Sequence, residues 1–133
     1  MLLDTSAWVE YFQATEKGSI IKSFFENNEI VYTCNITIAE ISVWCQKNKK
    51  DVSGFVELIK KLSKLLELSE DTLIESGRIY NEQRKINGKI GLIDCIIYSA
   101  AQIHGLILLT KDNDFKDMND VITIDEYSKK PTR

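Results

Sequence analysis

The sequence is poor in several residues that would mark other classes of protein: it has one histidine, His104, one proline and three cysteines without a CxxC pair. A lone histidine excludes catalysis by two histidines, and we expect His104 to be structural, near a helix C-terminus whose dipole favours it. Cys34, Cys45 and Cys95 lie in apolar surroundings. We therefore expect reduced, buried thiols and no zinc site.

Long apolar runs are also missing, since none approaches the roughly 20 residues that a membrane-spanning helix needs. The start, Met-Leu-Leu-Asp, shows neither the basic region nor the cleavage site of a secretory signal, so a cytoplasmic protein without a membrane association is expected. The 133 residues predict one domain, 1–133, with a polar C-terminal tail from about residue 127.

The net charge of −3 argues against a protein that holds nucleic acid by bulk positive charge. Lysines do cluster at positions 47, 49 and 50 and again at 60, 61 and 64, which leaves an RNA substrate open. We interpret both clusters as solvated helix faces. Trp8 and Trp44 are expected to pack in the core.

Short apolar segments alternate with amphipathic ones along the chain. Residues 1–3, 30–32, 106–109 and 121–124 are typical of buried strands, and residues 66–68 of a brief edge strand. Helices are expected to begin near residues 5, 20, 37, 51–53 and 69, and a buried helix to run from about residue 90 to Gly105. This alternation predicts a three-layer α/β/α fold, with helices flanking a short parallel sheet of about five strands.

Acidic residues follow two of these strands. Asp4 comes directly after the first strand, and Asp112 and Asp114 come just after the fourth. Ligand sites in parallel sheets lie outside the carboxyl ends of the strands, so these carboxylates should converge. Each also has a purely local interpretation, because Asp4 can cap the next helix and the Lys-Asp-Asn-Asp segment resembles a turn.

Two further acids lie within predicted helices. Glu40 follows Thr37 with the spacing of a capping box, which is a structural alternative to a functional role. Asp94 is surrounded in sequence by Leu92, Ile93 and other apolar residues. A carboxylate buried there without a partner would be costly, so a functional role is favoured.

Converging carboxylates predict a bound cation. At roughly 5 Å and an effective dielectric of about 20, each ionised pair repels by about 3 kcal/mol. Mg²⁺ or Mn²⁺ relieves this repulsion and prefers oxygen ligands. Such a site suits metal-assisted phosphodiester hydrolysis, in which the ion activates water and stabilises the leaving oxygen.

Four segments together resemble the ordered motifs of PIN-domain nucleases: Leu-Leu-Asp4-Thr-Ser6, Ile-Ala-Glu40-Ile, Leu-Ile-Asp94-Cys-Ile-Ile and Leu-Leu-Thr110-Lys-Asp112-Asn-Asp114-Phe115. The chain length is similar to that of VapC-type toxin ribonucleases of VapBC toxin–antitoxin systems. This resemblance implies a PIN-like fold and a Mg²⁺- or Mn²⁺-dependent endoribonuclease. It also implies an RNA substrate, a cognate antitoxin and a homodimer.

The resemblance assigns roles to individual residues. Asp4, Glu40, Asp94 and Asp112 match the family's catalytic and metal-binding quartet, and Asp114 matches an additional metal-binding acid whose role is more variable. The supporting hydroxyls correspond to Thr5, Ser6 and Thr110.

Two other classes of protein remain open. A phosphoacceptor, receiver-like signalling domain also places acids at strand ends with Mg²⁺, but it would need an acidic pair after the first strand, where Asp4 is followed by Thr-Ser. The same residues disfavour a haloacid-dehalogenase-like phosphatase, which needs a second Asp two positions on. A non-catalytic module could instead use the acids to receive arginines from a partner.

Overall fold

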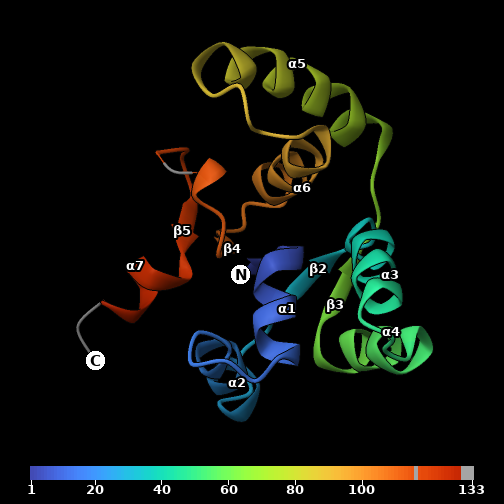
Figure 1. Cartoon of the computed structure of the whole chain (residues 1–133). Coiled ribbons are helices and arrows are strands. Elements are labelled where there is room, and N and C mark those ends of the chain that lie inside the picture. The colour runs from blue at the N-terminus through green and yellow to red at the C-terminus, as the bar shows by residue number, and fades with distance from the viewer. Residues whose placement is uncertain (116, 130–133) are drawn as a thin grey trace.

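Figure 1 shows the computed structural model, which describes residues 1–115 and 117–129. A five-stranded parallel sheet runs through it in the order β3-β2-β1-β4-β5. The strands are β1 Leu2–Leu3, β2 Tyr32–Cys34, β3 Lys64–Leu66, β4 Leu108–Thr110 and β5 Val121–Thr123. The predicted parallel sheet is confirmed.

Helices cover both faces of this sheet. One face carries α1 Thr5–Phe12, α2 Gly18–Glu26, α3 Thr37–Lys47, α4 Val52–Leu62 and α7 Ile124–Ser128, and the other carries α5 Glu70–Ile86 and α6 Leu92–Ile103. Because successive strand residues point to opposite faces, Leu3 and Leu109 pack in the first core, and Leu2 and Leu108 in the second. The predicted three-layer α/β/α architecture is therefore confirmed.

Strand boundaries differ slightly from the prediction. β2 begins at Tyr32 rather than at residue 30, and β3 lies at 64–66 rather than 66–68. β4 spans 108–110 rather than 106–109, which brings Thr110 into the sheet. Short apolar runs do not define their own ends, since register with neighbouring strands decides which residues pair.

A short helix, α7, precedes the expected polar tail and extends into it at residues 127 and 128. Its cap is Thr123, whose Oγ1 accepts a hydrogen bond from the Glu126 backbone N–H at 3.1 Å. Ile124, predicted to end the last strand, is instead the first helical residue and packs into the core. Residues 130–133 of the predicted tail, including Pro131, lie outside the described residues.

The helix α6 is less buried at its start than its apolar sequence predicts. Its middle, Cys95–Ala101, is buried, but Leu92 and Ile93 are 49% and 38% exposed. Asp94 follows them in the first helical turn and is only partly buried. The expectation of apolar surroundings for Asp94 therefore holds on one side of the helix only.

Several structural predictions are confirmed. All three cysteines are buried and free, and Trp8 is fully buried in the core. His104 is the C-cap residue of α6. Across residues 1–115 and 117–129, no helix combines the length and the apolar character that crossing a bilayer requires.

Candidate active site

The carboxyl ends of β1 and β4 meet where the strand order of the sheet reverses. β1 lies between β2 and β4: the chain passes from β1 to β2 and β3 on one side of it, and then crosses from β3 to β4 and β5 on the other. Asp4 follows β1 directly, and its backbone N–H donates to the Leu109 carbonyl of β4 at 3.2 Å. This is the position at which open parallel sheets form their crevice.

Asp4 is both a helix cap and the hydrogen-bonding centre of this crevice. Its Oδ1 accepts from the Ala7 backbone N–H at 3.0 Å, which confirms the N-cap interpretation. The same oxygen accepts from Ser6 Oγ at 2.7 Å, and Oδ2 accepts from Thr110 Oγ1. A buried carboxylate with these bonds is held rigidly, since three of its roughly four acceptor positions are filled.

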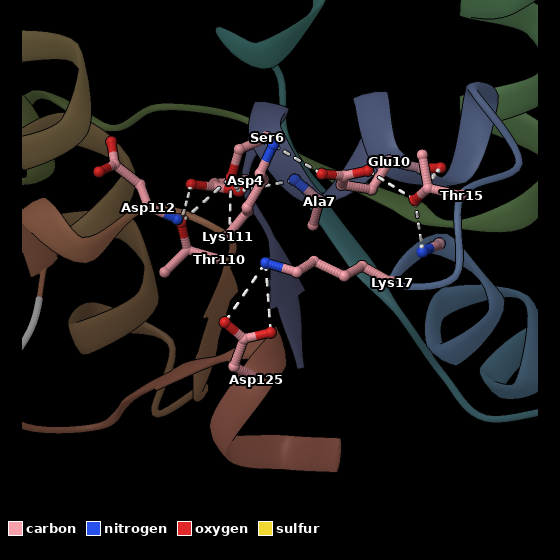
Figure 2. A network of polar contacts seen from close by, with 11 residues as sticks. Asp4, Ser6, Ala7, Glu10, Thr15, Lys17, Thr110, Lys111, Asp112 and Asp125 are labelled. Carbon is pink, nitrogen blue, oxygen red and sulfur yellow. Dashed lines mark hydrogen bonds and ion pairs between the residues drawn. The ribbon is translucent and has the colours of Figure 1, made fainter.

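The two hydroxyls that bind Asp4 also position the turn after β4. Ser6 Oγ accepts from the Lys111 backbone N–H at 2.9 Å, and Thr110 Oγ1 accepts from the Asp112 backbone N–H at 2.9 Å. Figure 2 shows this link between Asp4 and the turn. The start of α1 and the acidic turn are thus joined by hydroxyl bridges between residues 105 and 106 positions apart in sequence.

Three carboxylates come together beside this link. One oxygen from each of Asp94, Asp112 and Asp114 lies within 4.8 Å of the others, and all three side chains are partly buried. Asp94 Oδ2 accepts from the Gly91 backbone N–H at 3.1 Å, which holds the carboxylate at the start of α6. Asp112 Oδ1 accepts from the Asp114 backbone N–H at 2.9 Å, which fixes the turn.

Glu40 does not form the capping box that its sequence pattern predicts. Its Oε1 accepts a hydrogen bond from Thr5 Oγ1 at 2.6 Å, so the side chain reaches toward the start of α1. Thr37 Oγ1 is buried and has no hydrogen-bond partner within the described part of the chain. The capping-box alternative for Glu40 is therefore wrong, and its functional role stays a prediction.

The pKa values of two carboxyl groups reflect their burial first and the neighbouring charges second. Burial raises the pKa of Asp4 to about 6 against the opposing hydrogen bonds from Ser6, Thr110 and Ala7, and the Asp94 charge raises it further. Burial also raises the pKa of Asp94 to about 6; the Gly91 N–H opposes this rise, and the charges of Asp112, Glu40 and Asp114 add to it. All five acids therefore share one electrostatic environment.

The structure thus brings together all five acids that the sequence predicts, but the closest group of carboxylates differs from the predicted quartet. The closest group is Asp94, Asp112 and Asp114, while Asp4 and Glu40 lie beside it, bonded to hydroxyls. All three predicted supporting hydroxyls, on Thr5, Ser6 and Thr110, bond a carboxylate of this site.

Sequence reasoning missed two charged neighbours of the site, Glu10 and Lys111. Glu10 is 4% exposed, and its Oε1 lies 2.8 Å from Lys111 Nζ. The signal for Glu10 was available, because it follows Ala7 by three residues and therefore lies on the buried face of α1. A glutamate on such a face needs a partner.

The donor set suits a hard divalent cation. Three carboxylate oxygens within 4.8 Å of one another supply the oxygen ligands that Mg²⁺ and Mn²⁺ take. Burial and, to a smaller extent, the neighbouring charges raise the pKa values of Asp4 and Asp94, so a cation bound in the cluster would favour their ionised forms. These residues fit a divalent metal.

The fold and the acid cluster define the class of protein: the chain belongs to the PIN-domain family, whose model matches residues 1–121. The resemblance seen in the sequence motifs is thereby confirmed. Solved structures share the fold over 92% of this chain: a toxin–antitoxin complex from Klebsiella pneumoniae (TM-score 0.74, 24% identity, 96% of that chain) and DNA-bound VapBC from Salmonella typhimurium (TM-score 0.73, 20% identity, 96% of that chain).

Sequence similarity narrows the class. The chain is 31% identical over 120 residues to VapC ribonuclease Mb1587 of Mycobacterium bovis and to ribonuclease VapC11 of Mycobacterium tuberculosis. The match covers 86% of this chain and 88% of each relative. Within the PIN-domain family the chain therefore groups with VapC ribonucleases.

Proposed function

We propose that the protein is a divalent-metal-dependent endoribonuclease of the VapC type, the toxin of a toxin–antitoxin pair. The observation that carries the proposal is the group of three carboxylates, Asp94, Asp112 and Asp114, within 4.8 Å at the crevice of a PIN-domain sheet. Kinship with VapC ribonucleases supports RNA as the substrate.

Each acid has a distinct part in this proposal. Asp94, Asp112 and Asp114 would hold Mg²⁺ or Mn²⁺, which when bound activates water and offsets negative charge on the phosphodiester. Asp4 holds the turn that carries Asp112 through Ser6 and Thr110, and it keeps one acceptor position free.

Glu40 completes the acidic edge from the α3 side. Thr5 Oγ1 fixes its carboxylate by donating to Oε1 at 2.6 Å, so the second oxygen remains available to a water or an ion. The side chain is partly exposed, as an approach by solvent requires.

The test is cleavage of single-stranded RNA by the purified protein with Mg²⁺ or Mn²⁺, compared with Asp94→Asn and with excess chelator. We expect cleavage to leave 5′-phosphate ends and to fall at least 100-fold in the variant, since a removed metal ligand affects every turnover. Glu67→Gln is the matched control, because Glu67 is exposed and lies outside the site. Full activity of Asp94→Asn, or 2′,3′-cyclic phosphate products, would contradict the mechanism.

The alternative of a receiver-like phosphoacceptor finds no support in this geometry. A phosphoacceptor carboxylate must present a free oxygen to an incoming phosphoryl group. Asp4 is 5% exposed, and each of its oxygens already accepts a hydrogen bond. A non-catalytic acidic pocket is distinguished by the cleavage assay itself.

An antitoxin is the partner that we propose for a groove between α1, α2 and α4. The groove has a volume of about 450 Å³ and is lined mainly by apolar side chains, including those of Tyr11, Phe12, Phe55 and Leu58. An amphipathic helix suits such a groove. Structures similar in fold include toxin–antitoxin and VapBC complexes, which supports this partner.

A homodimer and a cytoplasmic location complete the proposal. Large apolar side chains are exposed on α5 and α6, among them Ile74 at 68% and Ile86 at 82%, and exposed apolar surface of this kind suits association. Sedimentation analysis of the purified protein tests the dimer. A monomer at all concentrations would contradict it.

A further inference from the structure

A lysine ion pair borders the candidate active site on the side of α1. Lys111 lies between Thr110 and Asp112, and its side chain runs back along α1 to Glu10, as Figure 2 shows. Its Nζ lies 2.8 Å from Glu10 Oε1, and the side chain is 51% exposed. Lys111 therefore presents a fixed positive charge to solvent beside a group of acids.

Glu10 is held from both sides. Its second oxygen, Oε2, accepts from Thr15 Oγ1, which in turn accepts from the Gly18 backbone N–H at 3.0 Å. Burial would raise the pKa of Glu10, but the hydrogen bonds from Lys111 and Thr15 and the charges of Lys111 and Lys17 hold it below its ordinary value. Glu10 is thus an ionised anchor, and the ammonium group is preorganised.

A depression of about 370 Å³ lies beside Lys111 and the acidic turn. It is lined by Ser6, Lys111, Asp112 and Asn113, so one wall is a carboxylate of the site and another is the lysine. Glu10 lies six residues after Asp4, which places the ion pair roughly 9 Å further along the α1 axis at 1.5 Å per residue. Lys111 and Asp112 both line the depression, so one RNA strand lying in it can contact the lysine and the acidic turn together.

Electrostatics explains why a substrate needs this lysine. Five carboxylates surround the proposed cleavage position, and one divalent cation neutralises only part of their charge. An approaching RNA strand carries a negative charge on every phosphate. A fixed cation beside the acids offsets this repulsion, and the ammonium group has further N–H donors besides the one directed at Glu10.

We propose that the depression receives the RNA phosphate next to the scissile one, that Lys111 binds this phosphate, and that Glu10 positions Lys111. This inference rests on the proposed ribonuclease function and assigns a substrate-binding contact and a positioning residue to it. Lys111 contributes to binding the strand, while the acids act on the bond that is cut.

The first experiment measures RNA binding without cleavage. In an Asp94→Asn background with Mg²⁺, fluorescence anisotropy of a short single-stranded RNA gives the Kd with and without Lys111→Met. We expect the Kd to rise about 10-fold and the slope of log Kd against log salt to fall by about 0.7, the value for one lost phosphate contact on a single strand. Lys111→Arg restores both quantities.

The matched control is Lys60→Met, which removes the same charge from a lysine of α4. Lys60 pairs with Glu57 at 3.5 Å, is 51% exposed like Lys111, and does not line the depression. We expect its Kd and salt slope to equal those of the Asp94→Asn background. Equal losses in both lysine variants would mean a general charge effect and would overturn the assignment of Lys111.

The second experiment uses the active enzyme. We expect Lys111→Met to raise KM about 10-fold with kcat changed less than 2-fold, because the contact is made equally in ground and transition states. Glu10→Gln is expected to raise KM about 3-fold and to leave the salt slope unchanged, since the lysine remains but is no longer anchored. An unchanged or lower KM in Glu10→Gln would overturn the positioning role.

The outcomes separate this inference from the proposed function. A wild-type protein that cleaves RNA, together with a Lys111→Met variant of unchanged Kd, KM and salt slope, overturns the lysine contact alone. A wild-type protein without cleavage overturns the proposed function, and the anisotropy measurement then still decides whether Lys111 binds RNA. Loss of partner binding with unchanged RNA binding would assign Lys111 to a protein interface and overturn the inference.

Discussion

Removing one charge from the acid cluster should stabilise the protein when no metal is bound. The change is Asp94→Asn, which keeps the shape of the side chain and an oxygen that can accept from the Gly91 N–H at 3.1 Å. What it removes is a partly buried charge, together with the cost of burying that charge and the repulsion from Asp112, Glu40 and Asp114, which all raise the pKa of Asp94. The variant therefore separates the electrostatic cost of the site from its packing.

The size of the effect follows from the raised pKa of Asp94. A rise from 3.8 to about 6 corresponds to an upper limit of about 3 kcal/mol of destabilisation above pH 6. Asp94 is only partly buried, so solvent screening reduces this to about 1–2 kcal/mol. For a domain of this size we expect Tm to rise by roughly 3–8 °C.

The assay is thermal unfolding at pH 8 in excess chelator and again in millimolar Mn²⁺. Asp94→Asn should melt above the wild type in chelator, and the wild type should gain more from Mn²⁺ because it retains all its metal ligands. Glu67→Gln removes one charge at an exposed position and should change neither Tm. If Asp94→Asn melts at or below the wild type in chelator, the charge on Asp94 does not destabilise the fold through burial and repulsion, and the reasoning fails.

Three further predictions follow from the same geometry. The metal-free protein should gain stability as pH falls from 7 to 5. Asp4 has a pKa of about 6 in the folded state and about 3.8 in the unfolded state, so the folded protein takes up the proton first. Chemical denaturation across this pH range measures the free energy of unfolding. Thr110→Val should lower the rate of RNA cleavage about 10–100-fold, because Asp4 and the Asp112 N–H both lose a hydrogen-bond partner. Thr123→Val, which lies outside the site, should retain activity in the same kinetic assay. Gly18→Ala should destabilise the fold by about 2 kcal/mol or more in urea titration, because the new Cβ would meet the Glu10 carbonyl oxygen at 2.1 Å; no loss of stability would contradict the close contact between α1 and α2.

The convergence of acids was predictable because it follows from the topology of parallel sheets. Asp4, Asp112 and Asp114 stand after strands whose carboxyl ends meet at one edge, so strand order alone brings them near. Asp94 was predictable for a different reason, as a charge in an apolar helix. Both arguments need only the alternation of segments along the chain.

Some finer features were not predictable, because the same local sequence pattern is compatible with two different arrangements of a side chain. Glu40 has the spacing of a capping box with Thr37, and only the tertiary position of Thr5 decides that it bonds there instead. The exposure of Leu92 and Ile93 depends on what packs against the start of α6, which hydrophobicity alone does not reveal. The Glu10–Lys111 pair joins segments that are distant in sequence, and its only sign in the sequence is a glutamate on the buried face of a predicted helix.

The hydroxyl bridges from Asp4 to Thr110 and Asp112 have a consequence for protein synthesis. They join Asp4, near the start of the described residues, to Thr110 and Asp112, which are synthesised much later. A growing chain that stops before the β4 turn has emerged would lack two of its three innermost carboxylates and both hydroxyl bridges to that turn. Translation itself would then delay the appearance of a nuclease, and unfinished chains would be harmless to the RNA around them.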